Sequence, residues 1–222
     1  MRFILAVFML AGTVSSASGQ IIRAPRGGEP PWIITATLGF LQAETIFDGS
    51  TGSAWDFGSA LQYRVAVERR LGDQAALGVS VAQASVPLRY FLAGESTPST
   101  TPCAGSSSSC DASSDMVTVA ASFSAGGSYG LHQILNLGLG ISFFDNFRED
   151  GSGQELAPLS GDKDFYMNLG YGLGYGISNR LAVALVQDAS FIVHQRTGLS
   201  GNSSSFHRLL VTRLGLRLSL GR

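Results

Sequence analysis

Between Phe165 and Ile177 the chain reads FYMNLGYGLGYGI, with glycine at every second position from Gly170 to Gly176. The positions between these glycines hold leucine or tyrosine. Because successive side chains point to opposite faces of a β-strand, this period of two predicts a strand with one bulky apolar face and one nearly empty face. Glycine weakens the interior of a strand, so its repeated use indicates a face that other groups approach closely.

The same alternation recurs along the chain and predicts eight strands. Their approximate ranges are 32–41, 54–71, 76–91, 116–125, 134–144, 165–177, 181–195 and 208–222. In the second range, Trp55, Phe57 and Tyr63 are predicted to share one apolar face, opposite Asp56 and Arg64. Several of these ranges exceed the five or six residues of an average strand in a soluble protein.

The connections between these strands alternate in length. Long polar segments lie near residues 45–53, 91–115, 145–164 and 195–205, and short turns lie near 71–74, 126–131 and 178–180. This alternation is typical of an up-and-down membrane barrel, which has short turns at one end and long loops at the other. We therefore predict an all-β fold, an eight-stranded antiparallel up-and-down transmembrane β-barrel. In such a barrel the apolar face contacts lipid, whereas in a soluble barrel it would fill the interior.

The N-terminal segment has the order of a secretory signal peptide. Arg2 precedes an apolar run over residues 3–12, and Ala17 and Gly19 occupy cleavable positions. We expect a signal peptide over residues 1–19, a periplasmic lead-in over 20–31 and the barrel over 32–222. No cysteine stands directly after the expected cleavage point near Gln20, which argues against a lipid anchor.

Composition excludes some classes of protein. Only 14% of residues are charged, against about a quarter in soluble domains, while 45% are hydrophobic. Lys163 is the single lysine beside fourteen arginines, and the absence of a basic run argues against a nucleic-acid partner. No apolar stretch after the signal peptide approaches the roughly 18 residues of a membrane helix.

Cys103 and Cys110 lie seven residues apart in a segment rich in serine and threonine. In an exported chain this spacing predicts a disulfide that closes a small loop, with two free thiols as the alternative. A zinc site would need more ligands than this segment offers, and we expect neither a metal nor a cofactor.

The face opposite the apolar residues should line a narrow lumen, where glycine and alanine leave room for longer polar side chains. We predict a lumenal polar network that includes an ion pair between Asp188 and Arg213, with Arg217 as the alternative partner. Gln187 would then face lipid, which suggests a bulge at this position. The predicted network residues are Arg64, Glu68, Asp188, Arg213 and Arg217.

Aromatic residues near strand ends are typical of the girdles at the two membrane interfaces. We place two of them toward the turn end and four toward the loop end. The two are Trp32 and Tyr63, and the four are Trp55, Phe57, Phe143 and Phe165.

In architecture, residues 30–222 resemble the small eight-stranded outer-membrane barrels of Gram-negative bacteria, the OmpA-, OmpX- and opacity-like group. Arg213–Leu220, RLGLRLSL, resembles the signal that such barrels present to the insertion machinery, with Arg213, Gly215, Leu218 and Leu220 at its defining positions. It departs from that signal in lacking a terminal aromatic residue and in being followed by two more residues. The resemblance implies an outer-membrane location and three partners: membrane lipid, the insertion machinery and periplasmic chaperones. We expect no peptidoglycan-binding domain after the last strand, so we do not expect that role of OmpA here.

For function, we expect no enzymatic activity, and a structural or surface-binding role carried by four long extracellular loops and any ligand that they bind. One alternative is a lipid-modifying enzyme, which would need a serine, a histidine and a carboxylate in reach of one another. The candidate histidines are His132, His194 and His207, but the H-x-S motif of lipid A deacylase barrels is absent. A small pore is the other alternative, and arginines and carboxylates inside eight strands argue for a plugged lumen.

Overall fold

The computed structural model describes residues 31–48, 51–72, 74–92, 103, 109–127, 129–194 and 206–221. The predicted signal peptide and the lead-in up to residue 30 lie outside this range. Within the described part of the chain there are ten β-strands, and no helix is long and apolar enough to cross a membrane. The strands are β1 (Trp32–Ala43), β2 (Ile46–Asp48), β3 (Ser53–Phe57), β4 (Ala60–Arg70), β5 (Ala75–Leu92), β6 (Ser109–Gly126), β7 (Gly130–Glu149), β8 (Asp162–Gly176), β9 (Leu181–Val193) and β10 (Phe206–Leu220).

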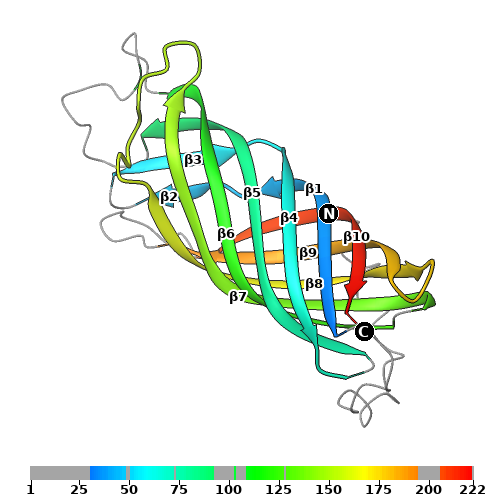
Figure 1. Cartoon of the computed structure of the whole chain (residues 1–222). Coiled ribbons are helices and arrows are strands. Elements are labelled where there is room, and N and C mark those ends of the chain that lie inside the picture. Colours follow the sequence, from blue (N-terminus) through cyan, green and yellow to red (C-terminus); the bar gives the residue numbers. More distant parts are fainter. Residues whose placement is uncertain are drawn as a thin grey trace, which may run out of the picture.

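These strands form the predicted closed barrel of eight antiparallel staves (Figure 1). β1 continues into β2 after a short break, and β3 continues into β4, so each of these pairs is one stave. The first and last staves pair through β1 and β10, and the β5–β6 pairing closes the ring. Closure matters because it leaves no unpaired strand edge inside a membrane.

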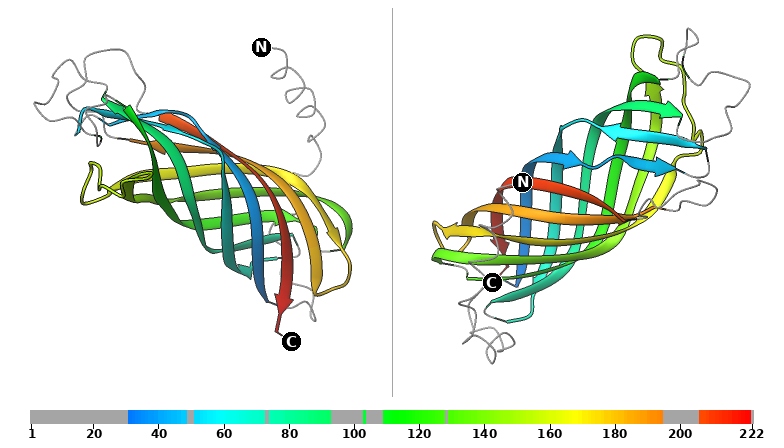
Figure 2. Two further views of the ribbon diagram at one scale, coloured as in Figure 1. Left: turned by 90° about the horizontal axis from the view of Figure 1, so that it is seen from above. Right: turned by 180° about the vertical axis from the view of Figure 1, so that it is seen from behind.

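The strand ends joined by the three short connections lie together at one end of the barrel, here the turn end. The strand ends joined by the long connections lie at the other end, the loop end (Figure 2). Two long connections are shorter than predicted, because β6 already begins at Ser109 and β7 continues to Glu149. β5, β6 and β7 therefore extend beyond β9 and β10 at the loop end (Figure 2). The sequence hides this extension because Asp111, Ser113 and Asp115 make the outer face of β6 polar there.

The apolar side chains point outward, as predicted for a barrel in lipid. Leu139, Tyr171 and Leu216 are 59%, 49% and 53% exposed, although each lies within a long, regularly paired strand. The opposite faces carry the buried polar and small residues. Because exposed apolar area of this extent is unfavourable in water, the outer face of the wall must contact lipid.

The alternating glycines of β8 make room for polar side chains from neighbouring strands. A Cβ atom built on Gly170 would overlap the carboxylate of Asp188 in β9. A Cβ atom on Gly138 in β7 would likewise overlap the amide oxygen of Asn168. The empty face of the glycine stretch is therefore the lumenal face, and its space is taken by groups such as Asp188.

The inward and outward faces exchange at a bulge between β3 and β4. Gln62 pairs with Ala84 and Phe57 pairs with Leu88, so residues 58–61 face residues 85–87, one residue fewer. The amide of Gly58 donates to the carbonyl of Pro87 at 2.7 Å within this bulge. One extra residue reverses the side-chain parity of the strand.

This bulge makes the girdle prediction wrong for two of its residues. Trp55 is completely buried and Phe57 is 9% exposed, so both point into the barrel rather than toward lipid. Their predicted face was extrapolated from Tyr63 across the bulge. The break between β1 and β2 has the same effect, because Leu41 and Ile46 both point inward although they are an odd number of positions, five, apart.

β7 has a bulge of the same kind opposite Ser113–Asp115. Asp145 and Asn146 are both exposed, and Asn146 adopts a φ of 55°, which asparagine tolerates better than most residues. As a result Phe147 points inward and Arg148 points outward. Beyond these breaks the wall surrounds an apolar interior, as a soluble barrel does, whereas nearer the turns the outer face is apolar.

Candidate functional site

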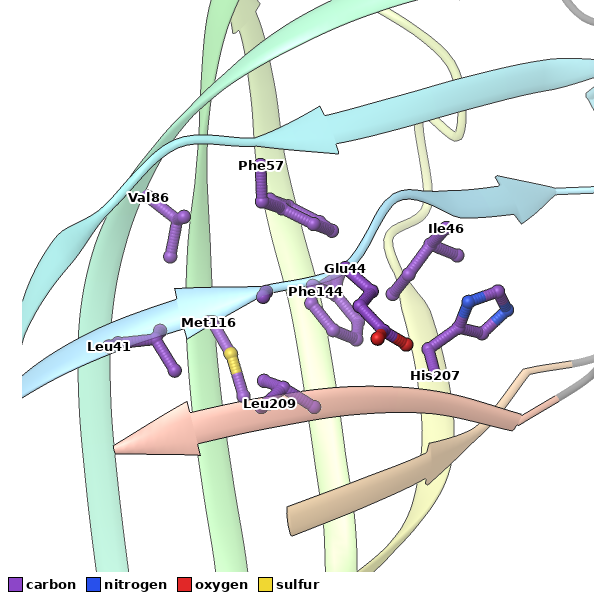
Figure 3. Close-up of a pocket in the computed structure, with 10 residues that line it drawn as sticks. Leu41, Glu44, Ile46, Phe57, Val86, Met116, Phe144, His207 and Leu209 are labelled. Atoms are coloured by element: carbon purple, nitrogen blue, oxygen red, sulfur yellow. The ribbon is translucent and has the colours of Figure 1, made fainter. Parts of the chain in front are cut away.

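The loop half of the lumen is filled by one apolar cluster. The ring of Trp55 lies 4.6 Å from that of Phe147 and 6.0 Å from that of Phe144, measured between centroids. Side chains from every stave join these rings, including Leu41, Leu88, Met116, Tyr166, Ile192 and Val211. The small apolar pocket between β1, β2 and β10, lined by Leu41, Ile46, Phe144 and Leu209, has a volume of about 10 Å³ (Figure 3). That is space for about one water molecule, so the cluster closes the lumen.

Below the apolar cluster, Asp188 is the centre of a polar layer. Arg213 donates to both carboxylate oxygens of Asp188, from Nε to Oδ2 and from Nη2 to Oδ1, the latter at 3.1 Å. Arg64 Nη1 lies 3.7 Å from Asp188 Oδ2. The predicted pair between Asp188 and Arg213 is thus present. Gln187 faces outward as expected, but the pairing of β9 with β10 is regular there and has no bulge. Gln187 lies opposite Thr212 and accepts a hydrogen bond from its hydroxyl group.

Two further residues of the predicted network lie nearer the turns. Glu68 accepts hydrogen bonds from Ser122 at 3.2 Å and from Ser124 at 3.0 Å, and all three side chains are buried. Arg217 is half-buried and points into the lumen, four residues beyond Arg213 on β10 and nearer the turn end.

At the loop end a second polar cluster covers the apolar one. It consists of Asp48 in β2, Asp162 and Asp164 in β8, and His194 directly after β9, and we refer to it as the Asp–His cluster. His194 Nδ1 lies 2.9 Å from Asp164 Oδ2 and 3.7 Å from Asp162 Oδ2, and its Nε2 lies 3.5 Å from Asp48 Oδ1. The imidazole is completely buried, and its ring centroid lies 5.2 Å from that of Trp55.

The Asp–His cluster lies beyond the membrane-spanning segments. The outward apolar run of β8 ends at Phe165, next to the exposed Lys163, and that of β9 ends at Val193. Burial disfavours the imidazolium, but the carboxylates of Asp164 and Asp48 outweigh this effect and raise the pKa of His194 to about 9. Burial also raises the pKa of Asp164, against the lowering influence of His194.

This geometry favours a protonated histidine held between carboxylates. Both ring nitrogens face carboxylate oxygens, and within the described residues no serine bonds to His194, so a serine–histidine–carboxylate triad is not formed there. One ligand atom each from Asp48, Asp162 and His194 lie within 4.8 Å of one another, close enough for one cation. An imidazolium would compete with that cation for the same carboxylates, because a metal needs a neutral ring nitrogen.

The remaining predicted site residues are distributed over the wall. Trp32, Phe143 and Phe165 are exposed on the outer face, and Tyr63 is also exposed but pairs with Leu38 in the middle of β1, not at the turn end. On β10, Leu218 and Leu220 point outward while Arg213 and Gly215 face the lumen. Cys103 and Cys110 form a disulfide.

Sequence reasoning considered His194 only as a catalytic candidate and missed its carboxylate partners. The available signal was positional. Asp162 and Asp164 come directly before one predicted strand, and His194 lies at the end of the next. An antiparallel hairpin therefore brings them to the same end of the barrel. Asp48 had no comparable signal, because its place in β2 depends on the break after β1.

A closed antiparallel barrel with an apolar outer face around a polar layer of the lumen is the architecture of outer-membrane β-barrels. This chain is an eight-stranded outer-membrane β-barrel. No protein-family model matches it, and no curated protein matches it.

Solved structures of similar fold include Neisserial surface protein A, at 11% sequence identity and a TM-score of 0.48. The match covers 85% of this chain and 97% of that chain. The outer membrane protein OprG of Pseudomonas aeruginosa matches at 12% and 0.44, covering 90% and 100%. The outer membrane protease OmpT of Escherichia coli matches at 8% and 0.42, covering 86% and 97%.

Proposed function

We propose that this barrel is a rigid stem that displays its long loops outside the cell, with a structural role in the envelope or a binding role at the surface, and without enzymatic activity. The observation that carries the proposal is the filled interior at the loop end. β5, β6 and β7 rise above β9 and β10, and their inner faces pack on Trp55 and Phe147. A stem with its own core positions loops without needing a channel through it.

The pore alternative is less well supported by this interior. An ion would have to pass the apolar cluster, where the pocket near Phe144 has space for about one water molecule, and then the Asp188–Arg213 pair. We expect no stable single-channel conductance in a planar bilayer. Stable conductance by the purified barrel would contradict the proposal.

The enzyme alternative would depend on His194. Because His194 is completely buried between carboxylates, it is poorly placed to activate a nucleophile for an external substrate. We expect purified protein to leave membrane lipid unhydrolysed. Lipid hydrolysis that disappears in His194→Gln but persists in His132→Gln would overturn the non-enzymatic assignment.

The decisive experiment separates a binding role from a structural one in living cells. Residues 93–108 are replaced by a four-residue glycine–serine turn together with Cys110→Ser, which leaves β5 and β6 complete, and Cys103→Ser/Cys110→Ser serves as the matched control. Loss of cell adhesion with unchanged barrel abundance supports a binding role for this loop. Unchanged adhesion, combined with detergent sensitivity only when the whole protein is absent, supports the structural role. If removal of the whole protein changes neither property, both forms of the proposal are wrong.

A further inference from the structure

The charges in the turn half of the lumen do not balance. Among the described residues, three arginines and two carboxylates point inward between the apolar cluster and the turns, besides Arg70, which donates to Ser219 near the turns. They are Arg64, Arg213, Arg217, Glu68 and Asp188. Arginine keeps its charge at any physiological pH, so these five side chains carry an excess of one positive charge. In a space screened from water, an unpaired charge is strongly unfavourable.

The two carboxylates are already engaged elsewhere. Asp188 accepts from Arg213 and lies beside Arg64. Both oxygens of Glu68 accept hydrogen bonds from serines of β6. Within the part of the chain that the structure describes, the Arg217 guanidinium makes no hydrogen bond or ion pair.

Arg217 lies between two small cavities. The inner cavity, inside the lumen, has a volume of about 30 Å³ and is lined by Arg213 and Arg217 together with Glu68 and the polar side chains of Thr35, Thr37, Ser124 and Asn136. The outer one opens at the turn end beside Arg70, Arg180 and Ser219. Guanidinium and hydroxyl donors therefore converge on a space that holds one or two water molecules.

We propose that a small inorganic anion, chloride among the common ones, binds in the inner cavity between Arg213 and Arg217. The size of the cavity suits a halide, which is close to water in size. Arg217 also lines the outer cavity, which opens at the turn end, so the anion would enter past this side chain. The anion neutralises the excess charge and gives Arg217 the acceptor that the described part of the protein does not provide.

The test uses the refolded full-length barrel in detergent. Its thermal unfolding midpoint is measured in sodium chloride, sodium bromide and sodium gluconate at equal ionic strength, with gluconate as an anion too large for the cavity. We expect chloride and bromide to raise the midpoint by a few degrees over gluconate. Arg217→Gln should abolish this difference, and Arg217→Lys should retain part of it. The matched control Arg208→Gln should retain all of it, because Arg208 is exposed on the outer face and pairs with Glu44.

A crystal grown in bromide locates the site directly by anomalous scattering. A bromide peak beside Arg217, absent in Arg217→Gln, supports the proposal. Equal stabilisation by all three salts, a halide effect that survives Arg217→Gln, or bromide peaks confined to the outer surface would each overturn it.

Discussion

His194 Nδ1 lies 2.9 Å from Asp164 Oδ2, and this contact connects the residue after β9 to the start of β8. The other ring nitrogen lies 3.5 Å from Asp48 in β2. Among the described strands, β2 pairs only with β3. The imidazole therefore links the β2–β3 hairpin to β8 and β9 at the loop end.

The first prediction concerns pH. The folded-state pKa of His194 is raised from its ordinary value of 6.5 to about 9, so its stabilising contribution is complete below about pH 6.5 and is lost as the pH rises through 9. We expect the free energy of unfolding, measured by denaturant titration in micelles, to fall by about 3 kcal/mol over this window. His194→Gln should remove the decrease, and the control His132→Gln should keep it. A flat profile for the unmodified protein would show that His194 is not the link described.

The second prediction concerns the lumenal ion pair. Asp188→Asn keeps the size of the side chain but leaves Arg64 and Arg213 without their carboxylate. Since removing one partner of a buried pair leaves an uncompensated charge, we expect a loss of about 3–5 kcal/mol in unfolding free energy. The exposed Asp150 provides the control, and Asp150→Asn should change stability by less than about 0.5 kcal/mol. Equal effects of the two variants would reject the pair.

The third prediction concerns the glycine stretch. Gly170→Ala places a methyl group where the Asp188 carboxylate lies, and that carboxylate is held by Arg213. We expect a destabilisation of about 1–3 kcal/mol from overpacking. In an Asp188→Ala background the same glycine substitution should cost much less, because the obstructing carboxylate is gone. A double-mutant cycle of unfolding free energies measures the difference, and strict additivity would show that the glycine serves another purpose.

The fourth prediction separates the only two tryptophans of the chain. Trp32 is exposed on the outer wall and Trp55 is completely buried in the interior. In vesicles of brominated lipid, Trp55→Phe, which retains Trp32, should show strong quenching of tryptophan fluorescence. Trp32→Phe, which retains Trp55, should show weak quenching and blue-shifted emission. Similar quenching in both variants would place Trp55 in the girdle after all.

Local sequence signals were enough for most of the barrel wall. Period-two alternation set the strands, and the placement of Leu139, Tyr171 and Leu216 toward lipid followed from the sorting of loop lengths. The Asp188–Arg213 pair was also accessible, because counting from a shared turn gives the height of each residue on adjacent strands. The alternation failed where a bulge or a break interrupted it, at Gly58, at Asn146 and between β1 and β2.

By itself the sequence determined the eight staves and their antiparallel order. It also determined which face of each regular strand meets lipid, because this depends on side-chain parity within one strand. Only the tertiary structure decided where parity reverses and which residues then meet. A bulge adds a single residue whose position depends on pairing with the neighbouring strand, and alternation read along one strand does not contain it. For that reason Trp55 was expected in lipid and is found in the core, and the Asp48–His194 contact emerged only when β2 was placed in space.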